Sequence, residues 1–162
     1  MLKYVDTKVV FAEIPDEITL AISISGCPYR CPNCHSSYLA EDTGQPLTAK
    51  AIDTLIRNNQ GISCLCFMGG DSDPSYLNLL AEYIKENYIN IKVAWYSGNE
   101  KIHDNINLWN FDFIKIGPYI DNLGPLISET TNQIMYRVIH LSGGKSKLYD
   151  ITYKYRKHET ED

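Results

Sequence analysis

The chain has 162 residues, of which 44% are hydrophobic and 22% are charged, and these values are ordinary for a folded globular domain. Its length fits one domain spanning residues 1–162, because domains commonly hold about 100–200 residues. The net charge of −5 at pH 7 argues against a nucleic-acid-binding protein, which needs a basic surface.

No segment predicts export or membrane insertion. The N-terminal sequence MLKYVDTKVVFAEIPDE lacks the apolar core of a signal peptide, and no stretch approaches the about 18 apolar residues of a membrane span. We therefore expect a cytoplasmic protein whose thiols stay reduced. Three of the five cysteines fall between positions 27 and 34, and in a reducing compartment such clustering indicates a metal site or catalysis more often than disulfides.

Taken in chain order, the apolar pattern predicts strands that alternate with helices. Residues 1–16 are expected to form an N-terminal strand extension, and residues 156–162 a frayed tail. Helices are expected after the caps Thr48 and Asp73, and a short one at 100–109. The predicted strands, rich in β-branched and aromatic residues, are 8–12, 17–24, 62–68, 91–96, 111–116, 133–139 and 147–155.

This alternation predicts an α/β fold with a parallel sheet. A complete eight-fold barrel takes about 250 residues, and at roughly 30 residues per unit this chain supplies only about five to six units. We expect an incomplete (β/α) barrel with the helices on the outside, or else an open sheet. Both architectures place ligands at the carboxyl ends of the strands, where the cysteine cluster follows strand 17–24.

The cysteine cluster has the sequence GCPYRCPNCH, in which Cys27, Cys31 and Cys34 are spaced Cx₃Cx₂C. A four-iron cluster usually takes four thiolates, so three leave one iron open to a further ligand. Pro28 and Pro32 stiffen the loop between the cysteines. The spacing therefore favours a [4Fe-4S] cluster with an open iron.

Other metal sites remain alternatives to this interpretation. A structural zinc ion would need a fourth ligand such as His35, Cys64 or Cys66, and a simple electron-transfer cluster is also compatible with the spacing. Cys64 and Cys66 lie two apart on a predicted strand, so they share one face and are expected to pack as small core residues. His35 directly follows Cys34, and adjacent residues rarely reach the same metal.

The Cx₃Cx₂C loop after the first barrel-like strand resembles the radical S-adenosylmethionine (SAM) superfamily. The resemblance implies a radical SAM type of barrel, in which the open iron chelates the methionine part of SAM. An electron from the cluster then cleaves SAM into methionine and a 5′-deoxyadenosyl radical. The cofactor carries this chemistry, and the protein positions and shields it.

Further segments extend the resemblance. Gly69-Gly70-Asp71 after strand 62–68 is similar to the superfamily's GGE motif, which contacts the methionine amino group, with Asp in place of Glu. Tyr96-Ser97-Gly98 ends the next strand, and residues that flank the last cysteine contact adenine in the superfamily. The residues that the resemblance implies for SAM binding are Asn33, Cys34, His35, Gly69, Gly70, Asp71 and Ser97.

Within the superfamily, the short length, GCPYRCPNCH, KIGPY (115–119) and TTNQIMYRV (130–138) resemble the anaerobic ribonucleoside-triphosphate reductase activating proteins. The sequence departs from that family at Lys115-Ile116, where an acidic residue commonly precedes Gly-Pro, and at Ile134, where Arg is common. The resemblance implies an enzyme that creates a glycyl radical on the large subunit of the reductase, with a flavodoxin or ferredoxin as electron donor.

Two alternatives remain. The first is a radical SAM enzyme that acts on another glycyl-radical protein or on a small molecule. The second is a zinc-binding or electron-transfer module that is not an enzyme.

Overall fold

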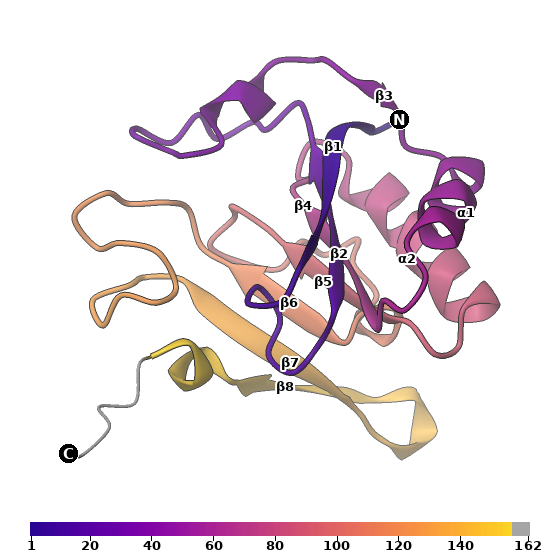
Figure 1. Ribbon diagram of the computed structural model, residues 1–162. Coiled ribbons are helices and arrows are strands. Elements are labelled where there is room, and N and C mark those ends of the chain that lie inside the picture. The colour runs from indigo at the N-terminus through magenta and orange to yellow at the C-terminus, as the bar shows by residue number, and fades with distance from the viewer. Residues whose placement is uncertain (157–162) are drawn as a thin grey trace.

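The computed structural model describes residues 1–156, and its centre is one eight-stranded sheet (Figure 1). The strand order is β3-β1-β2-β4-β5-β6-β7-β8. β2, β4, β5 and β6 run parallel, whereas β1 and β3 on one side and β7 and β8 on the other pair antiparallel. The bounds are β1 Lys3–Val10, β2 Thr19–Ile24, β3 Gln45–Pro46, β4 Cys64–Met68, β5 Lys92–Tyr96, β6 Phe113–Ile116, β7 Ile134–His140 and β8 Ser146–Asp150.

Two α-helices, α1 (Ala49–Asn58) and α2 (Pro74–Asn87), cover the same face of the sheet (Figure 1). The side chain of Thr48 accepts a hydrogen bond from the N–H of Ala51, and Asp73 accepts one from Tyr76, each at 3.1 Å. Both predicted caps are therefore confirmed, since they satisfy N–H groups that the first helical turn leaves free. Neither helix is long and apolar enough to cross a membrane, and the same is true of every helix in residues 1–156.

The two faces of the sheet carry separate cores because side chains alternate along each strand. Leu65 and Phe67 of β4 pack toward the helices, whereas Cys64 and Cys66 belong to a smaller core on the opposite face. Both cysteines are fully buried, which confirms that they pack as core residues. The face without an α-helix is the one on which the cysteine loop lies (Figure 1).

The predicted (β/α) barrel is wrong: the sheet is mixed, and only two of its connections contain an α-helix. Parallel pairing needs a crossover of about a dozen residues or more. Residues 11–18, between β1 and β2, and residues 141–145, between β7 and β8, are too short for one. Each pair therefore forms an antiparallel hairpin, and the sheet does not continue as repeated βαβ units.

Two further predictions differ from the structure. Residues 100–109 are irregular apart from the start of the 3₁₀ turn Leu108–Asn110. The predicted strand 147–155 ends at Asp150, whose carboxylate accepts a hydrogen bond from the N–H of Thr152 and so begins the 3₁₀ helix Thr152–Tyr155. Most of the predicted frayed tail, residues 157–162, lies outside the described residues.

Candidate iron–sulfur site

The cysteine loop follows β2 and is fixed at its first residues by backbone hydrogen bonds. The N–H of Gly26 donates to the carbonyl of Glu41 at 3.2 Å, and the N–H of Cys27 donates to that of Leu39 at 2.9 Å. The hydroxyl of Ser25 donates to the carbonyl of Thr43 at 2.6 Å. Residues 39–43 thus fix the start of the loop, while Cys31 and Cys34 farther along it line a cavity.

Each cysteine of the loop directly follows a residue with left-handed backbone conformation. The φ angles are 75° at Gly26, 43° at Arg30 and 58° at Asn33. A left-handed residue within a turn makes successive N–H groups converge, and such concave arrangements bind anions, including iron–sulfur clusters. Among the described residues, several loop N–H groups have no hydrogen-bond acceptor: those of Tyr29, Arg30, Cys31, Asn33 and His35.

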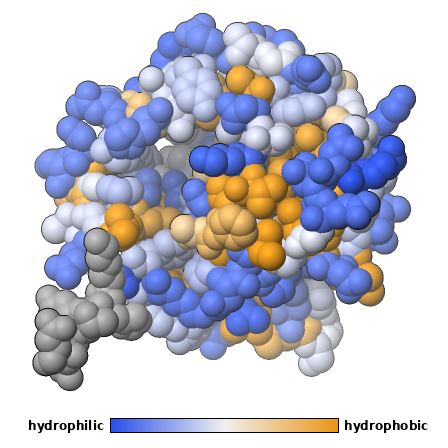
Figure 2. All heavy atoms as spheres, viewed as in Figure 1, coloured by the Kyte–Doolittle hydropathy of each residue, from blue (hydrophilic) through white to orange (hydrophobic). Residues whose placement is uncertain are grey.

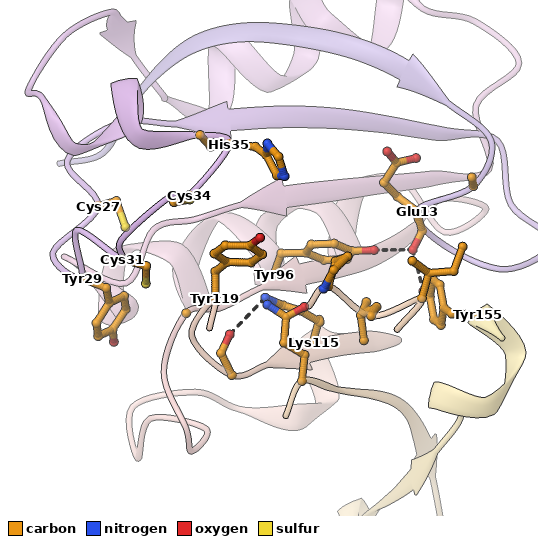
Figure 3. A pocket seen from close by; sticks show the side chains of 18 of the residues that line it. Glu13, Cys27, Tyr29, Cys31, Cys34, His35, Tyr96, Lys115, Tyr119 and Tyr155 are labelled. Carbon is orange, nitrogen blue, oxygen red and sulfur yellow. Dashed lines mark hydrogen bonds between the residues drawn. The ribbon is translucent and has the colours of Figure 1, made fainter. Parts of the chain in front are cut away.

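The three thiols line one cavity of about 660 Å³. Its walls come from the cysteine loop, the ends of β5 and β6, segment 12–15, residues 125–127 and the 3₁₀ helix at the end of the described chain. On this face of the molecule the surface is hollowed, with apolar side chains gathered beside the hollow (Figure 2). Figure 3 shows the cysteines at one end of the cavity, Glu13 and Tyr155 at the other, and Lys115, Tyr96 and Tyr119 between them.

All three cysteines of the loop are available as ligands. Cys27, Cys31 and Cys34 are free and half-buried. No three His, Cys, Asp or Glu side chains within residues 1–156 are arranged to hold one metal ion. In a four-iron cluster each thiolate binds its own iron, and the ligands stand farther apart than around one ion. Cys64 and Cys66 do not line the cavity.

Lys115 of β6 is a cavity residue that the sequence analysis did not select. Only 8% of it is exposed, and burial lowers the pKa of its amine to about 8, although Asp71 and Cys31 oppose this shift. Nζ donates to the carbonyl of Gly117 at 3.2 Å and lies 5.6 Å from the ring centroid of Tyr96. A lysine within the segment FDFIKI, which was expected to be a buried strand, was the available signal.

Asp71 and Ser97, two of the residues implied for SAM binding, are in direct contact. The Asp71 carboxylate accepts hydrogen bonds from the hydroxyl of Ser97 and, at 3.0 Å, from the N–H of Gly98. Burial raises the pKa of Asp71, and these two hydrogen bonds counter part of that rise. Gly98 lines the cavity, whereas Asp71 and Ser97 do not. These hydrogen bonds therefore position Gly98 in the cavity wall, although Asp71 and Ser97 do not line the cavity themselves.

Gly69 and Gly70 form the turn after β4, and both have left-handed φ angles, 107° and 101°. The N–H of Gly69 donates to the carbonyl of Tyr96 at 3.0 Å, and its own carbonyl accepts from the indole N–H of Trp95 at 2.9 Å. A Cβ on Gly70 would lie 3.0 Å from the side chain of Leu77. The turn is thus fixed against β5 and α2, and neither glycine lines the cavity.

Asn33 and His35, the two loop residues implied for adenine binding, are both connected to segment 117–121. Asn33 Nδ2 donates to Asp121 Oδ2 at 3.1 Å, and the Tyr119 hydroxyl donates to Asp121 Oδ1 at 3.0 Å. The rings of His35 and Tyr119 are 5.8 Å apart between centroids. His35 and Tyr119 line the cavity, and Asn33 lies outside it. Asp121, which joins the two loops, was not among the site residues predicted from the sequence.

The far end of the cavity is held by two tyrosines that share one acceptor. The hydroxyls of Tyr96 and Tyr155 both donate to the backbone carbonyl of Glu13, Tyr155 at 2.6 Å. Burial raises the pKa of both phenols, so they stay protonated as donors. Three segments that are far apart in the sequence therefore meet at this wall.

Three half-buried thiols on one loop with three left-handed residues, beside a cavity of about 660 Å³, are features expected of an iron–sulfur protein. A family model described as a 4Fe-4S single cluster domain matches residues 18–123, a range that includes the cysteine loop and the parallel strands. The match takes in more than half of the chain, and the chain belongs to this family. No curated protein and no solved structure matches it.

Proposed function

We propose that this chain is a radical SAM activating enzyme. In this proposal Cys27, Cys31 and Cys34 hold the [4Fe-4S] cluster and SAM binds beside it. The enzyme generates a glycyl radical on the large subunit of anaerobic ribonucleoside-triphosphate reductase. With cluster and SAM bound, reductive cleavage of SAM supplies a 5′-deoxyadenosyl radical that removes a hydrogen atom from the target.

The observation that carries the proposal is the cavity of about 660 Å³ onto which all three thiols open. Three cysteines leave one iron of a four-iron cluster without a protein thiolate, and no other cysteine lines the cavity. Ligand pockets of about 300–1,000 Å³ commonly hold molecules of cofactor size. A cluster that only transferred electrons would not need a ligand cavity at its open iron.

Several residues support SAM binding in different ways. His35 is on the cavity wall beside Tyr119 and offers a ring on which an adenine can stack. Gly98 has no side chain, so its backbone lies at the same wall, and its N–H donates a hydrogen bond to the carboxylate of Asp71. We assign Asp71 and Ser97 to positioning of the β5 end rather than to direct contact with SAM.

The protein target is supported by where the cavity lies. Both α-helices cover one face of the sheet, and the cavity opens on the other, among loops (Figures 1 and 2). A peptide segment of a partner can approach this face without displacing a helix. The reductase as the partner, and a flavodoxin or ferredoxin as the electron donor, follow from the sequence resemblance.

The first test is anaerobic purification of the wild type, Cys31→Ala and Cys66→Ala. We expect wild type and Cys66→Ala to contain iron and sulfide and to cleave SAM under reducing conditions, because Cys66 is buried away from the cavity. Cys31→Ala should lose reductive cleavage. Full cleavage by Cys31→Ala would remove the cysteine loop from the mechanism, and a wild type with one zinc ion and no iron would end the proposal.

The second test concerns the target. Wild type is incubated anaerobically with SAM, a reductant and the reductase large subunit, and electron paramagnetic resonance is recorded. A glycyl doublet that is absent with Cys31→Ala supports the reductase as target. SAM cleavage without a doublet would point to another glycyl-radical protein or to a small molecule. If the cluster transfers electrons but never cleaves SAM, the remaining interpretation is that the chain is an electron-transfer module.

A further inference from the structure

We propose that Lys115 sets the reduction potential of the cluster by holding a positive charge inside the cavity. The inference requires the cluster, which the family implies, and it does not require SAM cleavage. Lys115 is a positioning charge in this role and does not bind iron.

The geometry provides a buried cation on the cavity floor. Lys115 is 8% exposed and lines the same cavity as the three cysteines. Its Nζ reaches one carbonyl oxygen, that of Gly117, and the face of the Tyr96 ring, so neither contact neutralises the charge. No salt bridge to Lys115 is formed within residues 1–156.

The surroundings make this charge effective over distance. The charged form of the amine is favoured most by the Asp71 carboxylate and then by Cys31, Cys66 and Cys34, so two of the three loop cysteines are within electrostatic reach of Lys115. Charges within a protein interior interact more strongly than in water, because fewer water dipoles screen them. Among groups that line this cavity, Lys154 carries the same charge but is exposed, and solvent screens it.

The sign of the effect follows from the charge of the cluster. A four-iron cluster with three thiolates is already anionic, and reduction adds one more electron to it. A nearby cation stabilises the reduced form more than the oxidised form, and the reduction potential rises. Removal of the Lys115 charge should therefore make the cluster harder to reduce.

The experiment is a redox titration of the purified cluster protein without SAM, with mediators as the electron source and the reduced cluster detected by electron paramagnetic resonance. Lys115→Met removes the charge and keeps an unbranched side chain of similar size, Lys115→Arg keeps the charge, and Lys154→Met removes an exposed charge from the same cavity. We expect Lys115→Met to lower the ratio of reduced to oxidised cluster about tenfold at a fixed potential, which is a shift of 59 mV for a one-electron couple. Lys115→Arg and Lys154→Met should stay near wild type.

Three results would overturn the inference: an unchanged potential in Lys115→Met, an equal shift in Lys115→Arg, or an equal shift in Lys154→Met. Lys115→Gln serves as the second neutral variant if Lys115→Met does not accept a cluster. A wild type that forms no cluster would overturn the premise. If the potential shifts in Lys115→Met but the wild type does not cleave SAM, the inference about Lys115 stands and the proposed function is refuted. If the wild type cleaves SAM but the potential does not shift in Lys115→Met, the proposed function stands and the inference about Lys115 is refuted.

Discussion

Gly98 at the end of β5 is where the cysteine loop packs against the sheet. A Cβ added there would lie 2.7 Å from Cδ2 and 3.1 Å from Cε2 of the Tyr29 ring, whereas ordinary contact begins at 3.4 Å. Gly98 does not have a left-handed φ angle, so alanine is tolerated by the backbone and the effect is steric. Gly98→Ala thus tests whether Tyr29, between Cys27 and Cys31, holds the loop in place.

The expected magnitude follows from the type of contact. Overpacking of this kind costs about 1–3 kcal/mol when the surroundings resist and less when they yield. Tyr29 is on a loop, so we expect part of the strain to displace the ring and with it the cysteine loop. Gly98→Ala should lower the free energy of unfolding of the cluster-free protein within this range, and it should lower the iron content after reconstitution.

The assay is a double-mutant cycle with Tyr29→Ala, which removes the clashing ring. Urea unfolding is measured for the wild type, both single variants and the double variant, and iron content is measured after anaerobic reconstitution. In the Tyr29→Ala background, Gly98→Ala should change the free energy of unfolding by less than about 0.5 kcal/mol. Additive effects of the two substitutions would refute the packing argument.

Three further predictions concern single contacts. Asp121→Ala should speed loss of the cluster to a chelator, since the hydrogen bond to Asn33 is removed, and should change stability by less than about 1 kcal/mol. Trp95→Phe should lower the free energy of unfolding by about 1–3 kcal/mol, because the carbonyl of Gly69 loses its indole donor. In the cluster-free protein, the stability gain of Lys115→Met over wild type should shrink by on the order of 3 kcal/mol as the pH rises from about 8 to 10.5, measured by urea unfolding.

The sign for Lys115 follows from proton binding. Its pKa is about 8 in the folded protein and near the ordinary 10.5 when the chain is unfolded. Between these values the unfolded chain binds more protons, so the stability of the wild type rises with pH, whereas Lys115→Met lacks this dependence. A stability difference between Lys115→Met and wild type that stays constant with pH would contradict the buried charge.

The control for Asp121→Ala is Asp42→Ala, which alters an exposed aspartate bound to Lys3. An equal rate of cluster loss in both variants would show a general charge effect.

Strand positions were largely readable from the sequence, but strand directions were not. Hydrophobic periodicity locates β2, β4, β5 and β6, and the residue types at Thr48 and at Asp73-Pro74 locate both helix starts, because these depend on neighbours along the chain. Direction depends on the length and path of each connection. The eight residues 11–18 already exclude a parallel crossover from β1 to β2, and this restriction was the signal for a mixed sheet.

Local polar contacts explain the missing helix at residues 100–109. His103 Nδ1 accepts a hydrogen bond from the N–H of Asn105, and the Asn107 side chain accepts one from the N–H of Trp109, each at 3.1 Å. Short polar side chains that bond to nearby backbone compete with the helix. Within the site, the cysteine spacing predicted three thiols on one loop, and a lysine in a predicted buried strand was the signal for Lys115. Asp121 acts through a tertiary contact that no local pattern encodes.

The shared carbonyl of Glu13 also has a consequence for the order in which the site is built during synthesis. Its two tyrosine donors are 83 and 142 residues away along the chain. The cysteine loop and the parallel strands can be in place while the C-terminal segment is still on the ribosome, but the far wall closes only after Tyr155 has emerged. Until then the cavity is open at the end opposite the cysteines.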